Sequence, residues 1–189
     1  MKINFTYILD RVFRGYVAFF LLIYGTGKIF GNQFYLKNEL PENVANATLG
    51  NASAFDLAWT FMGFSYTYIL FIGISQIVGA FLLLFEKTKL LGVAILLPIL
   101  LNIVVFDMIF LDEYGALMSA SIYTIMLVSI LFLNKTRVWP AILNLIRVTK
   151  TPLVGGYPKL VHIGLMILVA GLIFGLDQFL VNLFGHGQG

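Results

Sequence analysis

The chain has 189 residues, of which 60% are hydrophobic and only 11% are charged, with a formal net charge of +3. A soluble domain carries about 25% charged residues, so this composition excludes a soluble fold and makes lipid the solvent for much of the surface. Cysteine is absent, which excludes disulfides, thiolate metal sites and cysteine nucleophiles. The small net charge gives no indication of nucleic-acid binding.

The first predicted membrane span runs from Phe13 to Ile29 and follows a short amphipathic entry. Residues 30–60 form the longest polar stretch, and their Asn, Gly and Pro content predicts an outward loop with one or two short helical turns. An interfacial aromatic belt is predicted where this loop enters the next span, because amphipathic rings gather at the membrane surface. Its members are Phe55, Trp59, Phe61 and Phe64.

Three further spans are predicted over residues 63–85, 90–111 and 115–133. In the span over residues 90–111, Asp107 is the single charged residue, and Asn102 adds a polar amide. This span is long enough to cross a bilayer core of about 30 Å. An ionisable side chain there is costly unless it faces protein, water or a partner. Asp107 is therefore the first candidate for a functional residue.

The C-terminal part divides into two predicted segments. Residues 134–159 are basic and contain a short amphipathic stretch, which predicts a cytoplasmic interfacial segment that contacts lipid or a partner. Its candidate contact residues are Trp139, Arg147 and Lys150, since basic groups are attracted to anionic headgroups. Residues 160–189 are predicted to form a fifth transmembrane helix and a short outer tail.

The distribution of basic residues predicts the topology. If the five spans alternate, all of the 12 Lys and Arg residues except Lys28 and Lys37 fall on one side. The positive-inside rule then predicts a bacterial cytoplasmic (inner) membrane protein with a cytoplasmic N-terminus and a periplasmic C-terminus. The fold class expected is all-α, a polytopic transmembrane helix bundle.

Several short patterns in the first half of the chain occur in a characteristic order. They are Arg11-x-x-Arg14-Gly15, then Tyr24-Gly25-x-Gly27-Lys28, then Ile77-Val78-Gly79-Ala80 with a tight charged turn after it. In this the chain resembles the DoxX/DoxX-like superfamily of small bacterial membrane proteins over roughly residues 8–133. The resemblance implies a four-helix membrane core, assigned to residues 1–133, and a possible link to quinone through thiosulfate:quinone oxidoreductase. The 30–60 loop and the fifth span depart from that pattern.

Polar residues on different spans are predicted to lie at similar depths in the membrane, where they can contact one another. Lys28 and Asp107 both lie near the outer end of their spans, so we hypothesise that they face each other inside the bundle, where pairing lowers the cost of burying either charge. A small polar cavity that opens outward would be lined by one intramembrane cluster. Its predicted members are Tyr24, Lys28, Gln76, Asn102, Asp107 and Tyr123.

Each member of this polar cluster also has a structural interpretation. Gln76 and Asn102 would more simply be hydrogen-bonded clamps between helices. Lys28 would extend its ammonium group to the outer interface instead of pairing, and Asp107 would belong to a structural ion pair rather than a ligand or proton site. Two distant histidines without cysteine make a metal site unexpected.

No recognised catalytic set is present, so catalytic residues stay unassigned and the interpretation leans away from an enzyme. The favoured function is a non-catalytic or accessory subunit of a membrane complex, with other membrane proteins as partners. The alternatives are a quinone-linked subunit of an oxidoreductase and a transporter that binds a small solute or lipid. No cofactor is evident from the residues, and quinone is the one that the resemblance allows.

Overall fold

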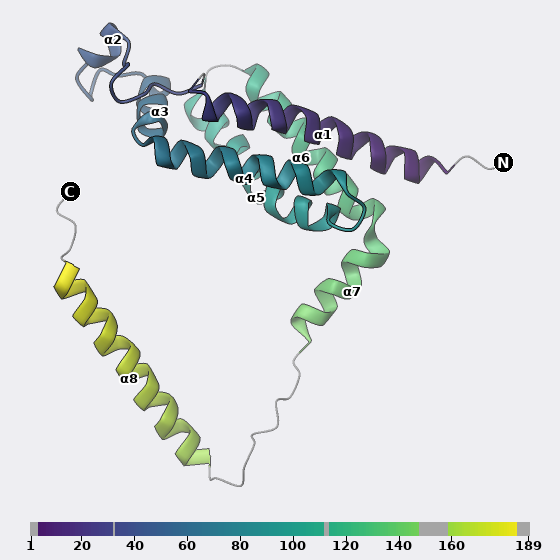
Figure 1. Cartoon of the computed structure of the whole chain (residues 1–189), viewed down its shortest axis with the longest axis vertical. Helices are drawn as coiled ribbons and strands as arrows, with labels where there is room; N and C mark the ends of the chain where they lie inside the picture. Colours follow the sequence, from purple (N-terminus) through teal and green to yellow (C-terminus); the bar gives the residue numbers. More distant parts are fainter. Residues whose placement is uncertain (1–3, 32, 112–113, 148–158, 185–189) are drawn as a thin grey trace. The chain divides into compact units, whose positions relative to one another are not determined.

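A computed structural model describes residues 4–31, 33–111, 114–147 and 159–184, and these residues form eight helices and no strand. The chain divides into two compact units, residues 1–146 and 147–189, which are described separately. Figure 1 shows the helices in chain order. They are α1 (Phe5–Ile29), α2 (Glu42–Ala45), α3 (Ala54–Gly63), α4 (Tyr66–Leu84), α5 (Lys89–Phe110), α6 (Tyr114–Leu133), α7 (Lys135–Ile146) and α8 (Lys159–Phe184).

Four long helices of the first unit pack as a closed ring. α1 packs against α4 and α6, α4 packs against α5, and α5 packs against α6, so each helix has two neighbours (Figure 1). The core between them consists of fully buried aliphatic side chains with Tyr123 at its edge. Its members are Val17, Ala18, Leu21, Ala80, Leu83, Val93, Leu96, Leu100, Tyr123, Leu127 and Ile130.

Glycines allow two of these helix pairs to approach closely. A Cβ atom on Gly73 of α4 would lie 3.0 Å from the carbonyl oxygen of Gly25 on α1. A Cβ atom on Gly92 of α5 would lie 2.7 Å from the backbone nitrogen of Leu83 and 2.8 Å from the carbonyl oxygen of Gly79 on α4. Small residues at such contacts are typical of helix pairs in membranes, where packing replaces the hydrophobic effect as the attractive force.

The outer surface of the bundle is apolar. Ile109, Ile125 and Phe132 are 63%, 64% and 71% exposed. Among the described residues, α4, α5, α6 and α8 are long and apolar enough to cross a membrane, with mean hydropathy from 2.1 to 2.6. An aqueous solvent would strongly disfavour such a surface, and the chain is therefore a membrane protein.

The helix boundaries differ from the sequence expectations at the N-terminus. Residues 5–12 are not a separate entry segment, because α1 begins at Phe5. The first turn of α1 is capped by the Asn4 side chain, which accepts a hydrogen bond from the Tyr7 N–H. α1 carries Asp10, Arg11, Arg14 and Lys28 and is not among the four membrane-length apolar helices. The first predicted span is thus part of a longer, more charged helix.

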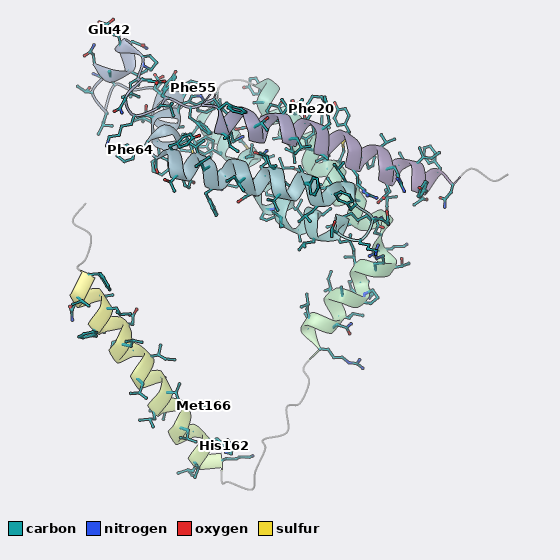
Figure 2. The ribbon with its side chains drawn as sticks, viewed as in Figure 1. Phe20, Glu42, Phe55, Phe64, His162 and Met166 are labelled. Atoms are coloured by element: carbon teal, nitrogen blue, oxygen red, sulfur yellow. The ribbon has the colours of Figure 1, made fainter. Side chains whose placement is uncertain are left out.

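The segment from 30 to 60 contains α2 and most of α3. Ser53 caps α3, since its Oγ accepts a 3.0 Å hydrogen bond from the Asp56 N–H. This cap marks the start of a ten-residue helix, longer than the one or two short turns expected in the loop. Figure 2 shows Phe55, on the first turn of α3, at the end of the bundle.

α7 is amphipathic and has no buried residue. Its exposed apolar side chains share one face at helical spacing: Trp139, Ile142, Leu143 and Ile146. Arg147, just after α7, is exposed, and Lys150 lies outside the described residues. In the second unit, α8 is apolar and none of its residues is buried.

Candidate functional site

Most of the polar cluster predicted from the sequence lines one cavity. Tyr24 and Lys28 of α1, Gln76 of α4, Asp107 of α5 and Tyr123 of α6 all contribute to a cavity of about 240 Å³. All four helices of the ring therefore contribute a polar group to a single space. Asn102 does not belong to it: this residue is exposed and lines an adjoining cavity of about 420 Å³.

Lys28 and Asp107 line both cavities and therefore lie where the two meet. Both residues are buried, at 6% and 7% exposure. Within the part of the chain that the structure describes, no ion pair of 4.0 Å or less joins them, and neither side chain has a hydrogen bond. The burial of Lys28 argues against an ammonium group that simply extends to the interface. Two charges thus face the cavities without neutralising each other by direct contact.

Gln76 has an unmet hydrogen-bonding requirement inside the bundle. Its side chain is almost fully buried, with the residue 1% exposed, and its Oε1 atom has no hydrogen-bond partner among the described residues. Leaving a buried acceptor without a donor costs about 1–3 kcal/mol. No side-chain hydrogen bond of Gln76 or Asn102 is present in the described chain, and their role as clamps between helices stays a prediction.

Two tyrosines line the smaller cavity, and one of them stacks on a further aromatic ring. Tyr123 stacks on Phe20 with ring centroids 5.7 Å apart, and the Tyr24 ring lies 6.4 Å from Tyr123. Phe20 is labelled on α1 in Figure 2. The tyrosines contribute apolar ring faces and hydroxyl groups to the cavity lining, which fits a ligand with one polar and one apolar part.

Two aromatic residues of α3 line the cavity, which the sequence analysis did not predict. Phe55 and Trp59 line it from α3, with ring centroids 4.2 Å apart, and Trp59 also lines the larger cavity. The sequence analysis assigned both rings to an interfacial belt, whereas Phe61 and Phe64 are the members exposed at 69% and 62%. The available signal was their spacing of four residues, which places them on one face of a helix. Gln33 and Ser119 are further lining residues that were not predicted.

The larger cavity is predominantly apolar. Ile95, Pro98 and Ile99 of α5 form one wall, and Phe71 and Ile72 of α4 form the other. Pro98, which lies inside α5, therefore also lines this space. An apolar cavity that shares Lys28 and Asp107 with a polar one has the form expected for a molecule with a polar head and an apolar tail.

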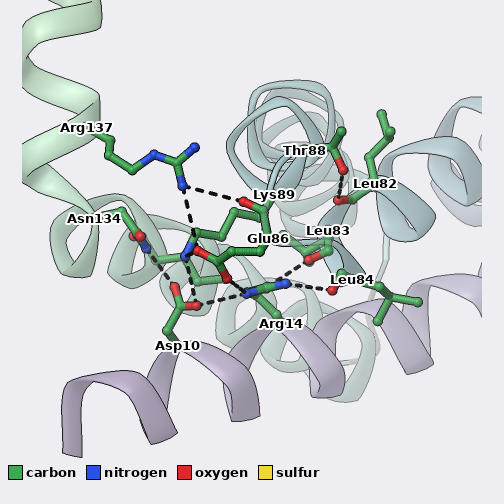
Figure 3. Close-up of polar contacts among 11 residues, drawn as sticks. Asp10, Arg14, Leu82, Leu83, Leu84, Glu86, Thr88, Lys89, Asn134 and Arg137 are labelled. Carbon is green, nitrogen blue, oxygen red and sulfur yellow. Dashed lines mark hydrogen bonds and ion pairs between the residues drawn. The ribbon is translucent and has the colours of Figure 1, made fainter. Parts of the chain in front are cut away.

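Figure 3 shows a second polar cluster, which the sequence analysis did not predict. It involves the beginning of α1, whereas Lys28 of the cavity is near the end of that helix. Arg14 of α1 donates hydrogen bonds from Nη1 to Asp10 Oδ2 at 3.0 Å and to Glu86 Oε2 at 2.7 Å. Its Nε and Nη2 atoms donate to the carbonyl oxygens of Leu83 and Leu84 at 2.8 and 2.6 Å. The arginine therefore satisfies backbone carbonyls at the C-terminal end of α4, which have no partner within the helix.

Asp10 is the other centre of this cluster. Its carboxylate accepts from Lys89 Nζ at 3.1 Å and from Asn134 Nδ2 at 2.6 Å, and Glu86 pairs with Lys89 at 2.7 Å (Figure 3). Burial raises the pKa of Asp10, but the hydrogen bonds from Asn134, Arg14 and Lys89 outweigh it and leave the pKa below its ordinary value. Hydrogen bonding by Lys89, followed by Arg14, also lowers the pKa of Glu86. Because its partners are satisfied, this cluster holds the bundle together rather than offering a site.

The cavity offers groups that bind a ligand through charge and hydrogen bonding. Among the described residues, no group of three or more His, Asp or Glu side chains is placed to hold a metal ion. The cavity presents one ammonium group, one carboxylate, one free amide oxygen and tyrosine hydroxyls. Trp139 and Arg147 belong to neither cavity.

Comparison with known proteins finds a relative that matches most of the chain. The chain is 36% identical over 129 residues to YwoB of Bacillus subtilis (strain 168), whose name describes it as an uncharacterised protein. The match covers 68% of this chain and 79% of YwoB. No family model matches the sequence, and no solved structure matches it.

Proposed function

Since the chain belongs to the same protein family as YwoB, whose name assigns no activity, we propose a function from the chain's own cavities: it binds a small amphipathic molecule from the membrane. One observation carries this proposal. Lys28, Asp107 and the Gln76 Oε1 atom are buried around one cavity without a direct partner among the described residues. Buried polar groups are normally paired, and a group left unpaired is explained by a missing ligand or water.

The apolar cavity beside the polar one decides what kind of ligand fits. A small polar solute would occupy only the cavity of about 240 Å³, whereas an amphipathic one would also fill the cavity of about 420 Å³. The ligand-binding alternative is thus favoured over the accessory subunit. The resemblance to the DoxX superfamily implies quinone as the ligand class. We also propose that residues 1–133 form a DoxX-like core.

The test is to identify what the purified protein carries. We expect the tagged chain, extracted in a mild detergent, to retain a membrane-derived molecule that mass spectrometry of an organic extract detects. Lys28→Met should lose most of it, whereas Lys37→Met, which alters an exposed lysine outside both cavities, should not. A folded wild-type protein without any stoichiometric small molecule would contradict the proposal.

A second candidate function rests on α7. The apolar face of this helix is exposed in the first unit, with Trp139 63% exposed, as expected for a segment that lies on a membrane or against another protein. As a non-catalytic or accessory subunit, the chain would use this surface to join a membrane complex. A protein that co-purifies in a fixed ratio with the wild type, but not with Trp139→Asp, would support this function; purification without a protein partner would count against it.

The proposal includes a location and an orientation. The Lys and Arg distribution supports placing the protein in a bacterial cytoplasmic membrane, with α1 as a fifth span. It also supports a cytoplasmic N-terminus and a periplasmic C-terminus. In this orientation the Arg14 cluster lies at the cytoplasmic end of the bundle and the polar cavity near the outer end.

A further inference from the structure

The polar cavity places specific demands on the headgroup of its ligand. Lys28 offers three N–H donors and a positive charge, and Asp107 offers carboxylate oxygens that only accept. The Gln76 Oε1 atom is a further acceptor that lacks a donor among the described residues. A ligand that satisfies all three must therefore supply an electron-rich oxygen on one side and N–H or O–H donors on the other.

Three common kinds of membrane amphiphile meet only part of this demand. The carbonyl groups of a neutral quinone accept from Lys28 but give no proton to Asp107 or Gln76. An anionic headgroup pairs with Lys28 but brings a negative charge close to the Asp107 carboxylate, which is unfavourable. A quaternary ammonium group has the positive charge that suits Asp107 but no N–H bond for the Gln76 oxygen.

We infer that the cavity takes a zwitterionic amphiphile with a phosphate or carboxylate group and a primary ammonium group, as in phosphatidylethanolamine. The anionic group accepts from Lys28, and the ammonium group donates to Asp107 and to Gln76 Oε1. The acyl chain fills the apolar cavity between α4 and α5, where Ile72, Ile95 and Ile99 line the wall. This inference rests on the proposed function, because it names the ligand class of the same site.

Two features of the cavities support this arrangement. Lys28 and Asp107 line both of them, so a headgroup held by these residues leaves its chain beside the apolar walls. The two side chains are not in direct contact within 4.0 Å, which leaves each charge available to the oppositely charged group of a zwitterion. Desolvated charge-assisted hydrogen bonds of this kind are the strongest that side chains form.

The experiment is a competition between headgroups on the whole chain. The delipidated protein in mild detergent receives equal amounts of phosphatidylethanolamine, phosphatidylcholine and phosphatidylglycerol with identical acyl chains, and native mass spectrometry counts the retained lipid. We expect phosphatidylethanolamine to be enriched over phosphatidylcholine by at least about tenfold, the factor expected for one hydrogen bond to a charged group. Glycerophosphoethanolamine, which has no acyl chains, should displace little of it.

Variants assign the preference to residues. Asp107→Asn and Gln76→Leu should reduce the preference for phosphatidylethanolamine over phosphatidylcholine, whereas Lys28→Met should weaken retention of every phospholipid. Lys37→Met is the matched control, because this exposed lysine lines neither cavity. Circular dichroism and size-exclusion chromatography show whether each variant is folded.

Fluorescence locates the bound lipid. The chain has only two tryptophans, so Trp139→Phe leaves Trp59, which lines both cavities, as the reporter. Phosphatidylethanolamine with brominated chains should quench it more strongly than the brominated phosphatidylcholine, and Gln76→Leu should remove the difference.

The outcomes separate this inference from the proposed function. Equal retention of phosphatidylethanolamine and phosphatidylcholine, or preference for phosphatidylglycerol, would overturn the zwitterionic headgroup and leave amphiphile binding in place. Displacement of the lipid by a neutral quinone would do the same. Equal competition by glycerophosphoethanolamine would overturn the acyl-chain assignment, and a folded protein that retains no amphiphile would overturn both proposals.

Discussion

Asp10 and Lys89 lie 79 residues apart in the sequence, yet their side chains form a buried ion pair of 3.1 Å. Asp10 is on the second turn of α1, and Lys89 is the first residue of α5. The pair connects helices that are not neighbours in the ring, and Arg14 and Glu86 extend it to the end of α4 (Figure 3). One end of the bundle is therefore fixed by charges and the other contains the cavities.

Removal of Arg14 should destabilise the bundle strongly. Arg14→Met leaves Asp10 buried with fewer partners and two carbonyl oxygens of α4 without a donor, and loss of one partner from a buried pair costs about 3 kcal/mol or more. Denaturant unfolding in detergent micelles measures the loss. Arg11→Met is the control on the same helix, since Arg11 is exposed, and it should change the free energy of unfolding by less than about 1 kcal/mol. Equal losses would contradict the role of the Arg14 cluster.

The same cluster should make stability depend on acid. The pKa values of Asp10 and Glu86 lie below their ordinary values of 3.8 and 4.5 in the folded protein. Groups with a lowered folded-state pKa stabilise the protein above the unfolded-state pKa, and this contribution is lost as pH falls through the folded-state value. Thermal unfolding between pH 7 and pH 3 should show stability declining as the pH falls below about 4.5. Asp10→Asn should flatten this decline, and an unchanged pH profile in that variant would speak against the linkage.

A single methyl group should disturb the α4–α5 contact. At Gly92 the added Cβ meets backbone atoms at 2.7 and 2.8 Å, which do not move aside as a side chain would. Gly92→Ala should therefore lower the free energy of unfolding by about 1–3 kcal/mol, the usual cost of overpacking. Gly15→Ala is the control, because a Cβ there has nothing within 4 Å. Equal stability of the two variants would contradict a close contact between α4 and α5 at Gly92.

Gln76→Leu should separate stability from binding. Without ligand, the variant removes a buried acceptor that has no partner among the described residues, so its stability should equal or exceed that of the wild type by up to about 2 kcal/mol. Added ligand should raise the unfolding temperature of the wild type more than that of the variant, since ligand that binds only the folded state stabilises it. A variant that is less stable without ligand would show that Gln76 serves the structure.

The absence of cysteine makes the orientation simple to measure. Asn38→Cys, in the segment between α1 and α2, and Lys87→Cys, in the turn between α4 and α5, place single thiols at exposed positions. In intact cells with a permeable outer membrane, a membrane-impermeant maleimide should label the first and not the second. Labelling in the reverse pattern would place the N-terminus outside the cytoplasm.

The length of the apolar stretches allowed the long helices and most of their ends to be predicted, because hydrophobic length is a local property of the chain. It did not show that Phe5–Val12 belongs to a long helix or that α3 exceeds the one or two short turns expected in its segment, and side-chain caps from Asn4 and Ser53 mark the starts of these two helices. Such a cap depends on one hydrogen bond and leaves little trace in hydropathy.

The sequence by itself determined that this is an all-helical membrane protein and that Lys28, Gln76 and Asp107 needed an explanation, since polar side chains in an apolar span are costly wherever they point. Only the tertiary structure decided which of them share a cavity, that Asn102 does not, and that Phe55 and Trp59 cover it. It also revealed the Asp10–Arg14–Glu86–Lys89 cluster. These relationships join residues of different helices, and contacts over such separations depend on how the helices pack.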